Sequence, residues 1–273
     1  MKFQLKAIAA AVVLAAAVPA QAAMDEGGTG NSSLTIAVYD LSTNYGALFD
    51  LGKSYSDFNV SGTSFADSNV DAAGTNFSWD LSSGDYATAW SGLLASANPA
   101  NLFFSVIAVD TIGTGAGNRG MISTINAETI ATVTGPNLSA IIGNWNSYLI
   151  EAQGPATISQ NHTLVDNGAS YGNTGLGTTA QFFLSNKPNG RGNVTGGAIG
   201  STLAVHQVVS GATNTAASTY SIFGNGAAFT LSANGALTYT TNDPVVVVPE
   251  ADTWAMMLLG LGFMGFAARR KQA

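Results

Sequence analysis

The chain has 273 residues, of which nine are basic, sixteen are acidic, two are histidine and none is cysteine, so its net charge is −7 at pH 7. The lack of cysteine excludes a disulfide scaffold, thiolate zinc, iron–sulfur ligation and a cysteine nucleophile. The acidic balance argues against a nucleic-acid partner, because that affinity comes mainly from Lys and Arg on phosphates. The hydrophobic fraction of 46% is enough for a packed core, so we expect a folded domain.

The first 22 residues have the three parts of a secretory signal peptide. A start carrying two lysines precedes an uninterrupted apolar run over residues 7–18, and Ala20 and Ala22 form a small-x-small cleavage signal. The run is too short for a transmembrane helix, which needs about 20 residues. We therefore predict export through the Sec translocon and cleavage by signal peptidase after Ala22, with Ala23 as the alternative.

Short alternating segments separated by Gly, Asn, Ser and Thr predict a mainly β domain, an antiparallel β-sandwich or jelly roll with one or two short helices. Predicted strands cover residues 33–39, 102–109, 121–125, 203–209 and 220–223. A hairpin is predicted over 228–240, because Asn234-Gly235 lies between two alternating segments.

Two segments have helical periodicity instead. Asp85 is expected to cap a helix over 86–97, and Asn137 or Ser139 a helix through Glu151. The apolar face of each helix carries aromatic residues, which we interpret as core packing. The glycine- and asparagine-rich segment 168–200 is predicted to be a long surface loop around one short strand.

Asp67, Asn69 and Asp71 place oxygen ligands at alternate positions, as at the start of a calcium loop. Ala72 and Ser78 occupy positions where an EF-hand needs Gly and Glu, so a full EF-hand is excluded. A looser Ca²⁺ site at this loop is the one cofactor that the sequence suggests. The alternative interpretation is a solvated acidic turn.

The sequence contains no recognisable catalytic motif. His162 is expected in a loop and His206 in a strand, and both are interpreted as structural or solvated because a zinc site or a Ser-His-Asp triad would need further groups. Glycoside hydrolysis needs a pair of carboxylates, and no spacing in the sequence singles out such a pair. The candidate acids are Asp80, Asp110, Glu128 and Glu151. Exposed aromatic rings could stack on sugars; the candidates are Tyr39, Tyr45, Tyr55 and Trp79.

A second uncharged apolar run, residues 254–268, lies close to the C-terminus and is followed by Arg269, Arg270 and Lys271. As a helix it would span about 22 Å, against about 30 Å for a hydrocarbon core. Trp254 suits the aromatic belt of a membrane interface, and the basic triplet marks the cytoplasmic side. We predict a short transmembrane helix over 254–268.

This tail resembles a PEP-CTERM sorting signal. The resemblance is carried by Val248, Pro249 and Glu250, by the glycine-rich run that starts at Trp254, and by the basic triplet. Ala251 stands where the commonest form has a second proline, and Pro249 keeps the stretch extended. The resemblance implies an exosortase in the inner membrane of a Gram-negative, exopolysaccharide-producing bacterium, which would act near Pro249 and Glu250 and pass the domain outward after a transient stay in that membrane.

The predicted organisation is therefore a signal peptide over 1–22, an exported domain over 23–248 and a sorting signal over 249–273. The exported domain has four basic and fourteen acidic side chains, a net charge of −10, so it should be soluble and repel acidic polymers. We expect a structural or adhesive protein of the cell surface or biofilm matrix. The alternatives are a secreted hydrolase acting on glycans or esters, and a calcium- or carbohydrate-binding module.

Overall fold

A computed structural model describes residues 24–40, 42–43, 45–58, 69–111, 119–125, 134–153, 162–165, 168–173, 196–211, 213 and 215–242. All of them lie in the first of two units, Met1–Asn242 and Asp243–Ala273. No helix within the described ranges is long and apolar enough to cross a membrane. The transmembrane helix predicted over 254–268 lies outside these ranges.

The described part of the chain forms twelve strands, three α-helices and four short 3-10 helices. The strands are β1 (Ser33–Asp40), β2 (Tyr45–Ser54), β3 (Asn76–Asp80), β4 (Leu102–Asp110), β5 (Gly120–Ile125), β6 (His162–Val165), β7 (Ala169–Asn173), β8 (Gly197–Ala198), β9 (Thr202–Val209), β10 (Thr219–Ile222), β11 (Ala228–Leu231) and β12 (Ala236–Thr240). The helices are η1 (Gly27–Thr29), α1 (Tyr55–Phe58), η2 (Asn69–Asp71), η3 (Gly84–Tyr86), α2 (Ala87–Ser96), η4 (Pro99–Asn101) and α3 (Gly135–Gln153).

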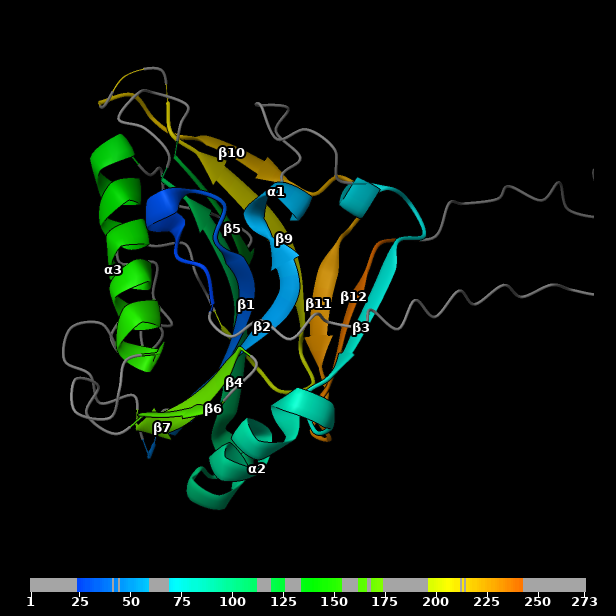
Figure 1. The fold of residues 1–273 in the computed structure, drawn as a ribbon. Coiled ribbons are helices and arrows are strands. Elements are labelled where there is room, and N and C mark those ends of the chain that lie inside the picture. The colour runs from blue at the N-terminus through cyan, green and yellow to red at the C-terminus, as the bar shows by residue number, and fades with distance from the viewer. Residues whose placement is uncertain are drawn as a thin grey trace, which may run out of the picture. The chain divides into compact units, whose positions relative to one another are not determined.

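All twelve strands belong to one antiparallel sheet. Its order is β3-β12-β11-β9-β5-β4-β1-β2-β7-β6, with β10 added to β9 and β8 to β4. The prediction of a mainly β, antiparallel domain is therefore confirmed, but a sandwich of two separate sheets is not what forms. Every neighbouring pair in this order is hydrogen-bonded, so the layers arise from the curl of a single sheet (Figure 1).

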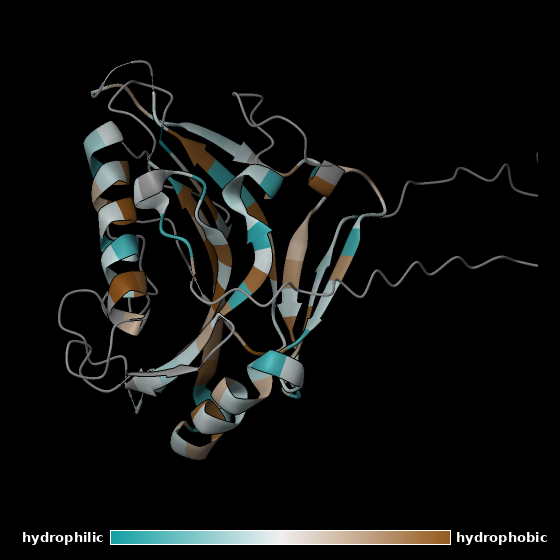
Figure 2. Cartoon of the chain, in the orientation of Figure 1, coloured by the Kyte–Doolittle hydropathy of each residue, from teal (hydrophilic) through white to brown (hydrophobic). Residues whose placement is uncertain are grey.

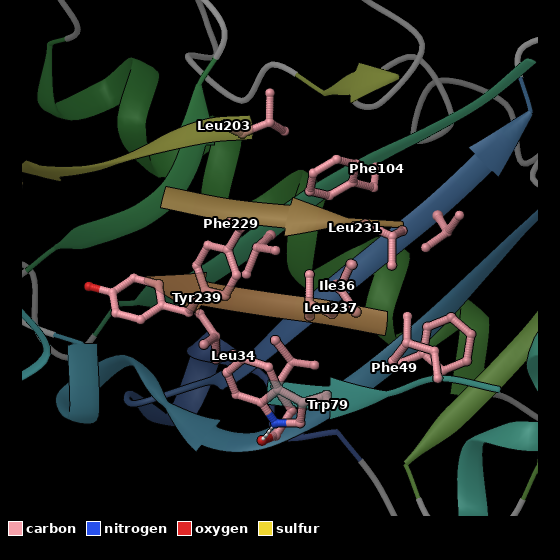
Figure 3. Packing of buried hydrophobic residues seen from close by; sticks show 14 of the residues in the cluster. Leu34, Ile36, Phe49, Trp79, Phe104, Leu203, Phe229, Leu231, Leu237 and Tyr239 are labelled. Atoms are coloured by element: carbon pink, nitrogen blue, oxygen red, sulfur yellow. Dashed lines mark hydrogen bonds between the residues drawn. The ribbon is translucent and has the colours of Figure 1, made fainter. Parts of the chain in front are cut away.

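The curl brings together strands that are far apart in the sheet order. The indole N–H of Trp79 in β3 donates a hydrogen bond to the carbonyl oxygen of Leu51 in β2 over 2.9 Å, and both residues are buried. The main core lies on this concave side, where side chains from both halves of the sheet meet (Figure 3). There the rings of Phe229 and Tyr239 have centroids 4.9 Å apart.

The strands β11 and β12 have the alternating burial that the alternating sequence predicts. Alternate residues of this hairpin are buried, and they are Phe229, Leu231, Leu237 and Tyr239. Between the strands, Gly235 has φ +91°, a left-handed conformation that favours glycine. The predicted hairpin is therefore confirmed.

A second core lies on the other face of β1, β4, β5 and β9, under α3. The buried face of this helix includes Ile141, Trp145, Tyr148 and Leu149, as predicted. Figure 2 shows brown, hydrophobic bands on α3 interrupted by teal ones, the pattern of an amphipathic helix. At nineteen residues α3 is longer than the short helices that we expected.

Several local predictions are corrected. The helix predicted over 86–97 is α2, but Tyr86 precedes it in a helical conformation with no side-chain capping bond, because η3 runs directly into α2; Asp85 is not the cap. The predicted loop 168–200 begins with β7 and ends near β8. His162, expected in a loop, begins β6. The strand expected within this loop lies outside the described residues.

Candidate functional site

The predicted calcium ligands are only partly described, and one of them has a structural role. Asp67 lies outside the described residues, while Asn69 and Asp71 are in η2. The two carboxylate oxygens of Asp71 accept hydrogen bonds from the backbone N–H groups of Gly224 (2.8 Å) and Asn225 (3.1 Å). Asn225 also donates its side-chain amide to the Asp71 carbonyl oxygen. Asp71 therefore joins η2 to the turn that precedes β11.

The acids considered for hydrolysis do not come together as a described pair. Asp80 is exposed at the end of β3, where the hydroxyl and N–H of Ser82 donate to its carboxylate and lower its pKa. Asp110 is buried at the end of β4. Glu128 and the side chain of Glu151 lie outside the described residues. Among those described, no group of three or more His, Asp or Glu side chains could hold a metal ion.

The aromatic residues considered for sugar stacking are mostly internal. Tyr39, Tyr55 and Trp79 are buried, and only Tyr45 keeps partial exposure at the edge of the main core. Burial raises the pKa of the Tyr55 hydroxyl, which accepts a hydrogen bond from the side-chain amide of Gln207 over 2.8 Å. These rings therefore build the core, and a sugar would have to bind elsewhere.

A polar cluster that sequence reasoning missed lies on β5, on β9 and at the start of β10. We call it the β9–β10 polar patch and define it as Ser123, His206, Ser218 and Tyr220. Ser123 is directly opposite His206 across the β5–β9 pair. The rings of His206 and Tyr220 have centroids 5.1 Å apart. Ser218 directly precedes β10 and lies two residues before Tyr220 in the chain.

The neighbours of the patch are apolar. Val208 is opposite Tyr220 on β10 and Met121 on β5, and both Val208 and Met121 belong to the core under α3. His206 is only 4% exposed, and its Nδ1 has no hydrogen-bond partner. Desolvation lowers the pKa of His206 to about 4, so the imidazole is neutral at pH 7. The patch therefore carries no charge at neutral pH.

The start of the described chain is held firmly in the fold. Met24 is 3% exposed and belongs to the core under α3. The N–H of Asp25 donates to the hydroxyl of Ser33 over 3.0 Å, and the N–H of Ser33 donates back to the Asp25 carbonyl oxygen over 3.1 Å. The N–H of Gly27 donates to Oδ1 of Asn146 in α3 over 3.0 Å. Tertiary contacts therefore begin two residues after the predicted cleavage site.

The end of the described chain is anchored in a similar way. The N–H of Thr241 donates to the Thr75 carbonyl oxygen (3.0 Å), and its hydroxyl accepts from the Thr75 N–H (2.8 Å). The N–H of Asn242 donates to the Asn225 carbonyl oxygen (2.8 Å), and the Asn242 carbonyl oxygen accepts from Gly74 (3.0 Å). Cleavage near Pro249 would leave all of these contacts in the mature protein.

Comparison with known proteins identifies the C-terminal signal. Residues 247–271 match the PEP-CTERM protein-sorting motif, and this range includes all the residues on which the resemblance was based, from Val248 to Lys271. No curated protein and no solved structure matches the chain. The motif marks an exported protein that an exosortase sorts to the cell surface. The signal itself and the cleavage residues Ala20 and Ala22 lie outside the described residues.

Proposed function

We propose that the mature domain is a non-catalytic structural or adhesive component of the exopolysaccharide matrix, to which exosortase processing delivers it. The PEP-CTERM motif at residues 247–271 is the single observation that carries this proposal. The proposed route uses signal peptidase, then transient retention in the inner membrane through residues 254–268, then exosortase action near Pro249 and Glu250. Sorting of this kind leads to the outside of the cell.

The arrangement of the chain ends supports this route. Anchored structure begins at Met24 and continues to Asn242. Six residues separate Asn242 from Pro249, so removal of the sorting signal takes away none of the twelve strands that the structure describes. A domain that keeps its whole sheet after processing is suited to persist outside the cell.

The charge distribution limits the kind of partner. The exported domain carries a net charge of −10. Its described cations are Lys53 and Arg119, and the Lys53 ammonium lies 5.2 Å from the ring centroid of Phe77. With so few cations, attraction to phosphate or acidic polymers is weak, so we expect attachment to uncharged components of the matrix.

The experiment compares the wild-type strain, which makes the protein, the exosortase and the exopolysaccharide, with two deletion strains. One deletion strain lacks the exosortase and the other lacks exopolysaccharide synthesis. We expect processed protein in the matrix fraction of the wild type, unprocessed protein in the inner membrane without exosortase, and processed protein released to the medium without exopolysaccharide. Equal retention with and without exopolysaccharide would contradict the matrix role. Turnover of glycans or esters by the exported protein, lost on changing His206 or an acidic residue, would support the hydrolase alternative instead.

A further inference from the structure

The predicted signal-peptidase site lies directly beside a segment that is fixed in the folded domain. We call residues 24–33 the N-terminal arm. Met24, the second residue after the predicted cleavage site, is 3% exposed and packs in the core under α3. The backbone N–H and carbonyl oxygen of the next residue, Asp25, are both hydrogen-bonded to Ser33. The side chain and backbone just after the cleavage site are therefore held by the fold.

Further along the arm, Gly27 is held by two distant parts of the chain. Its N–H donates to Oδ1 of Asn146 in α3 over 3.0 Å, and its carbonyl oxygen accepts from the N–H of Thr111, just after β4, over 3.1 Å. Asn146 is 119 residues away in the chain and Thr111 is 84 residues away. The arm can dock only after β4 and α3 have been made and have come together.

Docking of the arm restricts access to the cleavage site. A peptidase acts on a segment whose backbone is free to enter the active site, so a folded segment is cut only from its transiently opened state. On the other side of the predicted site, five residues, 19–23, separate Met24 from the apolar run over 7–18. In a folded precursor the bond would lie between the apolar run and the docked arm. Cleavage would then require the arm to open.

The C-terminal site has the opposite relation to the fold. Asn242 is the last residue of the described ranges, and its backbone is bonded to Asn225 and Gly74. Six residues lie between Asn242 and Pro249, and an extended chain of this length reaches on the order of 20 Å. The bond near Pro249 can therefore enter an active site while the domain stays folded.

We propose that the two ends of the chain are processed on opposite sides of folding. Signal peptidase acts while the N-terminal arm is still undocked: water adds across the Ala22–Ala23 amide, leaving a carboxyl group on Ala22 and an amino group on Ala23. The arm then docks under α3. The exosortase acts afterwards, on the folded domain. This inference rests on the proposed export route and adds the order of its steps.

The first step is tested with the full-length precursor, made without membranes, and purified signal peptidase in mild detergent. Precursor diluted from urea directly into the peptidase should be cut about 10- to 100-fold faster than precursor that has folded first. Burial of one Met side chain is enough to favour the docked arm to this extent. Precursor that gains no resistance to trypsin until it is cut would support the same order. Equal rates for folded and urea-diluted precursor would overturn the proposal.

A substitution in α3 tests the arm without changing any residue near the cleavage site. Asn146→Ala removes the acceptor of the Gly27 N–H, so folded precursor should be cut about three- to ten-fold faster, while urea-diluted precursor should be unaffected. Asn144→Ala, at an exposed position of the same helix, is the matched control. Tyr239→Phe controls for a general loss of stability, because it removes a hydrogen bond to Val70 in the main core. An Asn146→Ala rate no higher than that of either control would overturn the proposal.

The order of both steps is followed in cells by pulse-chase labelling and limited proteolysis. Protease resistance should appear only in chains that have lost residues 1–22, and before the sorting signal is removed. In a strain grown without the exosortase, the folded pool should be processed when the exosortase is supplied after translation is blocked. A protease-resistant chain that still carries the signal peptide and later matures, or a folded pool that the exosortase leaves uncut, would overturn the proposal.

Retention in the matrix is measured on the same samples, because it separates this inference from the proposed function. The predicted order of processing without retention would reject the matrix role alone. Retention with the reverse order would reject the order alone.

Discussion

The backbone N–H of Asn98 donates a hydrogen bond to the carboxylate of Asp40 over 2.6 Å, which ties the end of β1 to the segment between α2 and β4. The same carboxylate accepts from the N–H and hydroxyl of Ser42 (both 2.7 Å) and from the hydroxyl of Thr43 (2.9 Å). Burial alone would raise the pKa of Asp40, but the hydrogen bonds from Asn98, Ser42 and Thr43 outweigh it and lower the pKa to about 2.

Asp40→Ala should therefore lower the free energy of unfolding at pH 7 by about 2–3 kcal/mol, because several donors lose one charged acceptor. The unfolded pKa is about 3.9, above the folded value. Stability from Asp40 is thus fully present above about pH 4 and is lost as pH falls toward about 2. Urea unfolding at pH 7 measures the effect of Asp40→Ala, and urea unfolding between about pH 4 and about pH 2 measures the loss of the stability that Asp40 contributes. Asp85→Ala, at an exposed position, should change stability by less than about 0.5 kcal/mol, and an equal effect in both variants would contradict the account.

His206 predicts a second, separate loss of stability in acid. Its folded pKa of about 4 is below the unfolded value of about 6.5, so the unfolded chain binds more protons between these values. Stability should fall as pH drops from about 6.5 to about 4, by on the order of 2 kcal/mol. In His206→Gln the dependence in this window should flatten, while His162→Gln should retain it. An unchanged pH profile in His206→Gln would show that His206 is not buried in the neutral form.

Gly27 and Gly28 form a matched pair at the start of the domain. A Cβ at Gly27 would overlap Cγ2 of Val109 and lie 3.1 Å from the Val109 carbonyl oxygen, whereas the nearest atom to a Cβ at Gly28 is Nδ2 of Asn146 at 3.8 Å. Gly27→Ala should therefore destabilise the protein by about 1–3 kcal/mol. Gly28→Ala should be close to neutral. Thermal unfolding of both variants is the measurement, and equal Tm values would contradict the described anchoring of this segment.

Substitution of Asp71 distinguishes a structural role of this residue from a metal-binding role. Asp71→Ala removes the acceptors for the Gly224 and Asn225 N–H groups, so we expect a lower Tm in EDTA and the same loss with Ca²⁺ present. Wild-type protein is the comparison in each buffer. A Ca²⁺-dependent rise in the wild-type Tm that is absent in Asp71→Ala would instead favour the calcium loop predicted from the sequence.

Local patterns predicted those elements whose own residues alternate or repeat. The hairpin β11–β12 and the two aromatic helix faces were predictable because burial follows a period of two or of about 3.6. Five of the described strands were not predicted. They are β2 with its Gly46, Asp50 and Gly52, β3 with only five residues, and β6, β7 and β8. Each of the first two is a strand because of its partner, since β2 pairs with β1 and β3 with β12.

The curl and the polar patch depend on contacts between distant segments. Nothing around Trp79 in the sequence indicates that its indole meets Leu51 across the core. Likewise, Ser123, His206 and Tyr220 come from three strands, and only the register of β5, β9 and β10 brings them together. The targeting signals at the two ends of the chain differ from the curl and the polar patch, because each signal is defined by the order of neighbouring residues. The sorting motif at 247–271 is therefore recognisable from the order of its residues alone.

The most direct test of the account is the intact mass of the protein recovered from the cell surface of the producing bacterium. The account predicts a chain that begins at Ala23 and ends near Pro249 or Glu250, with any added group attached at that new C-terminus. The same measurement in a strain without the exosortase should find the chain extending to Ala273 in the inner membrane. Surface protein that still contains residues 254–273, or processing that is unchanged without the exosortase, would contradict it.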